Sequence, residues 1–386
     1  MASLFEEKIV LVLSTFILLG IFATGISQVV ARPLNSDEVY TKNYVHKFAL
    51  INCILGDPLD DANHFPLSHM VEKGYEVILD SLGFHWSYVQ PAYYENTLWQ
   101  ILLRIPSVLF ISIAVAFSFY FYSRNFSPAI GFLNFVASIS SAPLWIHMAE
   151  ARYYALWYLL TTLHIAFVLL IANKKPKRED SLWDILIVIQ FLLSLCVVFS
   201  ILNIIATVVV FACFRLISKK FLACTTTQLG FWFYYYSVSP KRLWFFAPHG
   251  PPLKLFLAHF PYERLFVVFL FLFFIVFSYG NIRRKLEEQL PLFFFCLISF
   301  LLTILEMIKL HTLRTEVAGA GSEVANRYFF NLTALSVVAM SCFSFIIIKS
   351  VYNKPWLRFI IILILTMPFI CRLERTMSLY LFFWLL

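Results

Sequence analysis

Charged residues are scarce in this chain. Of its 386 residues only 13% are Asp, Glu, Lys or Arg, whereas 61% are apolar and Phe alone occurs 43 times. A soluble domain carries about 25% charged residues, so this composition excludes an ordinary water-facing surface. Uncharged apolar runs such as 265–277 and 359–370 are typical of a polytopic membrane protein.

Paired cysteines are also missing. The seven Cys residues show neither a CxxC motif nor any paired spacing, which argues against a disulfide framework and against a zinc cluster. Four of them lie inside apolar runs, and we expect these to be small core residues. They are Cys196, Cys213, Cys296 and Cys342. The first apolar run has no small-residue cleavage site, which favours a retained span over a removed signal peptide.

The apolar runs predict an all-α membrane protein with about eleven transmembrane helices in a single domain, residues 1–386. The run 184–217 is too long for one crossing, and its polar residues Ser200 and Asn203 predict a tight turn. The expected spans are 9–30, 98–122, 127–146, 153–172, 184–200, 202–217, 221–239, 264–280, 290–308, 327–349 and 356–371.

The net charge of +8 reflects Lys and Arg in short loops between spans, a pattern that sets membrane topology and gives no indication of nucleic-acid binding. The basic clusters fall on one side if the N terminus is cytoplasmic. Segments 31–97, 143–152, 240–263 and 309–326 then face outward. In 31–97, apolar residues at helical spacing predict short helices along the membrane interface; they are Val71, Tyr75, Ile78 and Leu79.

The acidic pair Asp37-Glu38 follows the first span by only a few residues. One interpretation is structural: Asn35 or Ser36 caps a short helix, and both carboxylates lie in its first turn, where the helix dipole favours negative charge. The other is functional: a general base or a cation ligand beside a cavity open to the outside.

Further polar groups gather at the predicted outer ends of spans. His64 lies in the first loop, and Arg104 opens the second span, where snorkelling to the headgroups is the default for a single Arg. Glu150, Arg152 and Tyr153 open the fourth span, and Arg327-Tyr328 opens the tenth. An ion pair or an aromatic interfacial anchor would explain them. Two Arg-Tyr pairs would equally suit an anionic headgroup, because the guanidinium fork matches phosphate oxygens.

In this order the motifs resemble those of the GT-C superfamily of integral membrane glycosyltransferases, in the branch related to protein O-mannosyltransferases and lipid A aminoarabinose transferase. The resemblance rests on five elements, strongest over residues 1–215. They are Asp37-Glu38, the His-Pro-Pro-Leu-Tyr-like His64-Phe65-Pro66-Leu67-Ser68, the Arg-Leu-Pro-Ser-like Arg104-Ile105-Pro106-Ser107, the Glu-Ala-Arg-x-Tyr-Ala-Leu-like Glu150 to Leu156, and Arg327-Tyr328. Phe65 and Ser68 depart from the family pattern.

The resemblance implies a glycosyltransferase of a bacterial inner or plasma membrane, active on the extracytoplasmic side. A hexose or pentose would pass with inversion from a polyprenyl-phosphate donor to a hydroxyl of a lipid, glycan or protein acceptor. Asp37 would be the general base, with Glu38 beside it. Arg152, Arg327, Tyr153 and Tyr328 would bind the donor phosphate, and His64, Glu150 and Arg104 would position the reactants.

The same sequence could also belong to a transporter or to another kind of membrane glycosyltransferase. A transporter or flippase for a lipid-linked saccharide is less favoured, because the charges gather at one face instead of the midplane and no inverted repeat is visible. A ligase of the O-antigen type would carry its large loop late in the chain, whereas here it comes first. Some members of the superfamily use a divalent cation and others do not, and one acidic pair does not decide between them. If Mg²⁺ or Mn²⁺ is used, Asp37 and Glu38 would bind it, with Asp57, Asp60 and Asp61 as further ligands.

Overall fold

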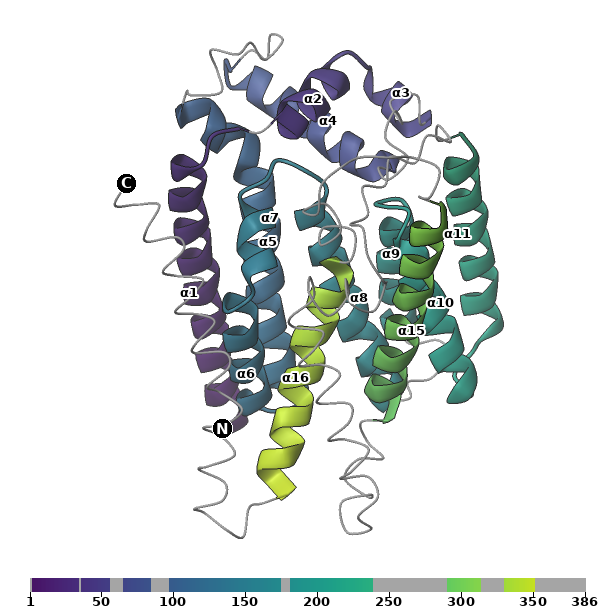
Figure 1. The fold of residues 1–386 in the computed structure, drawn as a ribbon. Helices are drawn as coiled ribbons and strands as arrows, with labels where there is room; N and C mark the ends of the chain where they lie inside the picture. Colours follow the sequence, from purple (N-terminus) through teal and green to yellow (C-terminus); the bar gives the residue numbers. More distant parts are fainter. Residues whose placement is uncertain are drawn as a thin grey trace.

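A computed structural model describes residues 2–34, 36–55, 65–84, 97–174, 181–238, 290–313 and 330–350. Every regular element within these ranges is an α-helix. Most helices run side by side as a bundle, and the three helices within residues 36–81 lie across one end of it (Figure 1). The predicted spans 264–280 and 356–371 lie outside the described residues, so the expected number of about eleven spans stays a prediction.

Among the described residues, three helices are long and apolar enough to cross a membrane. They are α1 (Ala2–Ala31, with its candidate span at Glu7–Ala31), α5 (Thr97–Asn125) and α8 (Tyr154–Lys174). They match the predicted spans 9–30, 98–122 and 153–172. Helix α1 packs along α5, which in turn contacts α6 and α8. The outer side chains of α1, such as Phe16 and Leu19, are large, apolar and exposed, as expected for a surface that faces lipid.

The predicted span 127–146 is wrong as one continuous helix. The chain forms α6 (Pro128–Ile139) and α7 (Ala142–Met148), separated at Ser140 and Ser141. Pro143 explains the break, because proline has no N–H to donate to the Ile139 carbonyl four residues earlier, whereas it is tolerated in the first turn of α7. Ser127 caps α6 by accepting a hydrogen bond from the Ala129 N–H at 3.3 Å.

The run 184–217 divides as expected, although the turn lies earlier than Ser200 and Asn203. Helix α9 (Ser181–Ser194) ends before a turn at 195–199, and α10 (Ser200–Cys213) begins at Ser200 and contains Asn203. Each helix has 14 residues and therefore rises about 21 Å, less than the ~30 Å hydrocarbon core. The remaining bundle helices are α11 (Lys219–Val238), α15 (Leu290–Leu313) and α16 (Phe330–Ser350).

Three of the four cysteines expected in the core, Cys196, Cys296 and Cys342, are buried. Cys213 is instead exposed at the C-terminal end of α10, so the expectation is wrong for this residue. An apolar run marks a segment as membrane-embedded, but it does not say which of its side chains face lipid and which face protein.

The first loop contains helices, as its apolar spacing predicts. They are α2 (Ser36–His46), α3 (Leu50–Leu55) and α4 (Pro66–Ser81), and they cover one end of the bundle (Figure 1). Two N–H groups at the start of α4 donate to carbonyls of the 195–199 turn, from Phe65 to Cys196 at 3.4 Å and from Leu67 to Leu195 at 3.0 Å. Helix α4 is thereby anchored to the α9–α10 hairpin at its N-terminal end.

A second contact fixes α4 on α5. Pro106 lies inside α5 and has no N–H, so it cannot donate to the Leu102 carbonyl four residues earlier. The Tyr75 hydroxyl of α4 donates to that carbonyl at 2.7 Å. Burial raises the pKa of Tyr75 to about 12, so its hydroxyl keeps the proton that this hydrogen bond requires.

We predict that Tyr75→Phe lowers the free energy of unfolding by about 1–3 kcal/mol, because it leaves the Leu102 carbonyl without a donor. In a Pro106→Ala background the backbone N–H that alanine restores supplies that donor, and the same substitution should then cost little. Unfolding of the four proteins in detergent measures both differences. An equal cost in both backgrounds would contradict this role for Tyr75.

Candidate functional site

The acidic pair lies where α2 begins, at the covered end of the bundle. Helix α2 starts at Ser36, so Asp37 and Glu38 occupy its first turn, as the capping interpretation expects. The side chain of Asp37 lies outside the described part of the structure, whereas that of Glu38 is fully buried. The two neighbouring carboxylates therefore have to be considered separately.

Glu38 forms a two-point ion pair with Arg104 of α5. Arg104 Nε donates to Glu38 Oε1 at 2.8 Å, and a second guanidinium nitrogen donates to Oε2 at 2.7 Å. Neither side chain is exposed at all. Arg104 therefore does not snorkel to the headgroups, and that expectation is wrong: a carboxylate and several backbone carbonyls satisfy its donors inside the protein.

The same ion pair is hydrogen-bonded to two further segments. Arg104 donates to the carbonyls of Val29, Arg32 and Pro33 at the end of α1. Glu38 Oε1 also accepts from the Ala151 N–H at 2.6 Å, in the turn between α7 and α8. The Glu38–Arg104 pair thus joins α1, α2, α5 and the 149–153 turn at a single point. Buried charges are tolerated only when they are paired and hydrogen-bonded.

Glu150 forms a second ion cluster in that turn. Its carboxylate lies 3.3 Å from the Arg32 guanidinium and 3.0 Å from His147 Nδ1. Burial opposes ionisation of Glu150, yet His147, Arg32 and Arg152 together lower its pKa to about 2. The structure therefore shows an ion pair at Glu150, which was one of the two interpretations of the Glu150–Arg152 motif. This ion pair fixes the backbone next to Arg152.

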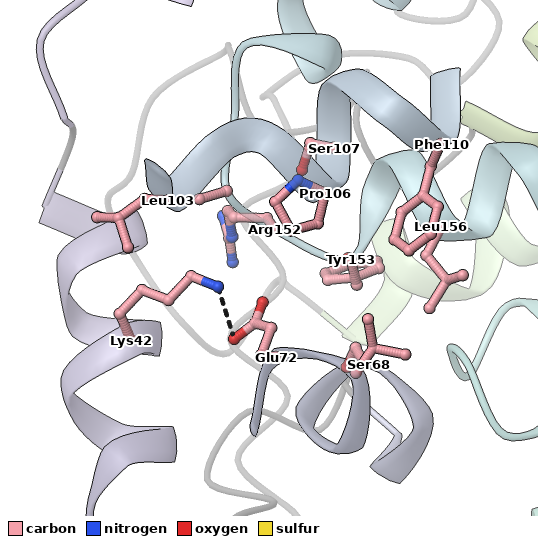
Figure 2. A pocket seen from close by; sticks show the side chains of 12 residues that line it. Lys42, Ser68, Glu72, Leu103, Pro106, Ser107, Phe110, Arg152, Tyr153 and Leu156 are labelled. Carbon is pink, nitrogen blue, oxygen red and sulfur yellow. Dashed lines mark ion pairs between the residues drawn. The ribbon is translucent and has the colours of Figure 1, made fainter. Parts of the chain in front are cut away.

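A small pocket opens where α2 and α4 meet the ends of α5 and α8. Its polar side chains come from α2, α4, α5 and the 149–153 turn, and its apolar side chains come mainly from α5 and α8. Figure 2 shows them converging on one hollow. The lining residues are Lys42, Ser68, Val71, Glu72, Leu103, Pro106, Ser107, Phe110, Ala151, Arg152, Tyr153 and Leu156.

Two cations and one carboxylate meet in this pocket. Lys42 Nζ lies 3.3 Å from Glu72 Oε2, and both side chains are about nine-tenths buried. The Arg152 side chain points toward this pair (Figure 2), and its guanidinium lies 5.3 Å from the centre of the Tyr154 ring. Burial raises the pKa of Glu72, against the opposing charges of Lys42 and Arg152.

The structure brings together only part of the predicted site. Arg152 and Tyr153 line the pocket, whereas Glu38, Arg104 and Glu150 lie in the ion pairs that hold its walls. His64, Arg327 and Tyr328 lie outside the described residues, so the predicted pairing of two Arg-Tyr motifs stays a prediction.

Sequence reasoning missed Lys42 and Glu72. A signal was present on α4, where Glu72 and Glu76 are four residues apart beside the apolar positions Val71 and Tyr75. Carboxylates at the border of an apolar helix face become partly buried when that face packs, so they need cations or hydrogen-bond donors beside them. Glu76 forms ion pairs with His46 and Lys73, and Glu72 forms one with Lys42.

The residues present do not favour a metal at Glu38. Both of its oxygens already accept hydrogen bonds from Arg104, and one accepts a third from Ala151. Among the described side chains, no group of three or more His, Cys, Asp or Glu residues could hold a metal ion. Asp57, Asp60, Asp61 and the Asp37 side chain lie outside that part.

Comparison with known proteins finds similar solved structures. No protein-family model and no curated protein matches this chain. Two of the structures are of ArnT from Cupriavidus metallidurans, in the apo state and bound to undecaprenyl phosphate, both at 13% identity and with TM-scores of 0.49 and 0.48. They match 85% of this chain, which spans 59% of the length of those proteins. At this degree of overlap they identify neither a family nor an activity.

We predict that Glu38→Gln lowers the free energy of unfolding by about 3–5 kcal/mol, since it leaves Arg104 charged and buried without its partner. Glu7→Gln is the matched control, because the Glu7–Arg124 pair is about half exposed and should be worth less than ~1 kcal/mol. Thermal unfolding in detergent compares the two variants. Equal stability of Glu38→Gln and the wild type would contradict a structural role for the buried pair.

Proposed function

We propose that this protein is a membrane glycosyltransferase. It transfers a monosaccharide from a polyprenyl-phosphate donor to an acceptor hydroxyl at the outer face of the membrane, with inversion. The observation that supports it best is the pocket at the covered end of the bundle, which sets two cations against an apolar wall. A lipid phosphate has both parts, an anionic head and an apolar chain.

The polar side of the pocket suits a phosphate. Lys42 and Arg152 supply charge-assisted donors, and the Ser107 and Tyr153 hydroxyls add neutral ones within the same lining. The apolar side of the pocket belongs to α5 and α8, which are long and apolar enough to cross a membrane. Its side chains are Leu103 and Phe110 of α5 and Leu156 of α8. A prenyl chain would therefore lie along α5 and α8 while its phosphate remains at the cations.

The covered end of the bundle is proposed to be extracytoplasmic. The opposite end carries Lys174, Arg124 and Lys220 at helix termini, and cytoplasmic ends are the ones enriched in Lys and Arg. The N terminus of α1 lies at that opposite end (Figure 1), which gives a cytoplasmic N terminus.

In the proposed reaction Asp37 accepts the proton of the acceptor hydroxyl as general base. The hydroxyl oxygen forms a bond to the anomeric carbon of the sugar, the bond from that carbon to the phosphate oxygen breaks, and the polyprenyl phosphate leaves with the electron pair. Lys42, Arg152 and Arg327 stabilise the charge that grows on the phosphate, where preorganised electrostatics contribute most. Tyr153 and Tyr328 complete that phosphate site.

The remaining residues position this machinery. Glu38 is assigned to its ion pair with Arg104 and not to proton transfer, because both of its oxygens are already occupied. That pair sets the place of α2 and hence of Asp37 and Lys42. Glu150 holds the turn that carries Arg152, and His64 is proposed to orient the reactants.

We predict that Asp37→Asn reduces sugar transfer by about 10²–10⁴-fold, the usual contribution of a general base. Membranes containing the variant would be incubated with a labelled polyprenyl-phosphate sugar, and labelled product would be counted. Asp80→Asn is the control, because Asp80 is an exposed carboxylate on α4. Transfer at the wild-type rate by Asp37→Asn would rule out Asp37 as the base.

We predict that Lys42→Met and Arg152→Met each weaken binding of a polyprenyl phosphate by about 10–100-fold, the value of one hydrogen bond to a charged group. Binding of radiolabelled undecaprenyl phosphate to the purified proteins measures this effect, with Lys220→Met as a control at the opposite end. Counterflow of labelled saccharide in proteoliposomes without any covalent product would instead favour a transporter or flippase.

A further inference from the structure

One charged group of the pocket has no part in the proposed reaction. Glu72 comes from α4, and its carboxylate contacts Lys42, the cation assigned to the donor phosphate. A buried carboxylate next to an anion-binding lysine weakens the binding of any anion. Its presence therefore calls for an explanation beyond the structural stability of α4.

Among the described lining residues, Lys42 and Arg152 carry two positive charges and Glu72 carries one negative charge. Arg327 and Asp37, which the proposed function adds to the site, bring one charge of each sign, so the net charge is +1. The proposed donor is a phosphodiester with a single negative charge. The lipid product is a phosphomonoester, whose second ionisation has a pKa near ~6, so it approaches two negative charges above neutral pH. Donor and product therefore differ by one charge at the atoms that the pocket contacts.

This difference in charge is large in a buried site. The free energy of removing an ion from water grows with the square of its charge, whereas its attraction to a fixed net charge grows only linearly. A pocket with one net positive charge thus matches a monoanion. Without Glu72 the pocket would have two net positive charges and would match the dianion.

We propose that Glu72 is a specificity residue that tunes the pocket to the monoanionic phosphodiester donor and speeds release of the dianionic phosphomonoester product. This inference rests on the proposed function and names the chemical class that the phosphate site prefers. The selectivity arises because the Glu72 carboxylate competes with the phosphate for Lys42 and repels the second negative charge of the product.

The surroundings of Glu72 fit this role. Burial raises its pKa while Lys42 and Arg152 oppose that rise, so the carboxylate depends on the same two cations that a phosphate would engage. Cys53 of α3 is another titratable group close enough to interact with this carboxylate. On α4 itself, Lys73 and Glu76 form a separate cluster with His46, and His69 is buried one turn earlier.

The test compares two ligands that differ by one charge and one methyl group: a polyprenyl phosphate and its methyl phosphodiester. Their dissociation constants would be measured at pH 8 on the purified full-length protein in nanodiscs. We expect the wild type to prefer the diester. We expect Glu72→Gln to shift the ratio of the two constants toward the monoester by about tenfold or more, because a like charge beside the dianion has been removed.

Two controls accompany this comparison. Glu76→Gln removes the same charge one turn further along α4, from a carboxylate paired with His46 and Lys73, and should leave the ratio unchanged. Glu72→Asp keeps the charge and should keep the wild-type preference. In turnover assays, Glu72→Gln should be inhibited more strongly by added polyprenyl phosphate, with a smaller change in the KM for the donor.

The outcomes separate this inference from the proposed function. If the wild type binds neither ligand, the lipid-phosphate site itself is overturned. If it binds both but prefers the monoester, or if Glu72→Gln leaves the ratio unchanged, the role of Glu72 alone is overturned. The wild-type preference needs no variant, so the inference can be rejected even if Glu72→Gln fails to fold.

Discussion

The buried ion pair between Glu38 and Arg104 is the interaction on which the candidate site depends. Arg104 belongs to a membrane helix and Glu38 to the helix that covers its end, and their two hydrogen bonds are supplemented by backbone groups at the end of α1 and in the 149–153 turn. Charged groups without water are costly, so this arrangement is stable only when every partner is present. The pair therefore contributes little net stability to the fold, and its main effect is to fix the relative positions of the segments that it joins.

That constraint explains how the pocket obtains residues from distant parts of the chain. Lys42 follows Glu38 by one turn of α2, Ser107 follows Arg104 by one turn of α5, and Arg152 follows Ala151 directly. Each of these lining residues lies close along the chain to a group held by the same ion pair. The opposite end of the bundle differs, since its Glu7–Arg124 and Asp184–Lys220 pairs are about half exposed and contribute little to stability.

The sequence predicts the long helices well, because about 20 apolar residues in a row leave few alternatives. It also predicts helices in the first loop from the spacing of Val71 and Tyr75. It fails where the outcome depends on tertiary partners. The burial of Arg104 requires Glu38 to lie opposite it, 66 residues away. The Lys42–Glu72 pair likewise forms only when α2 and α4 cross, and no local pattern encodes that crossing.

Helix α4 is held at two points that belong to different halves of the bundle. Its first turn is bonded to the carbonyls of Leu195 and Cys196, and its third turn is bonded through Tyr75 to the carbonyl that Pro106 leaves open. Glu72 lies between these two supports. The turn of the α9–α10 hairpin therefore contributes to the position of the Glu72 carboxylate relative to Lys42, although no described residue of that turn lines the pocket.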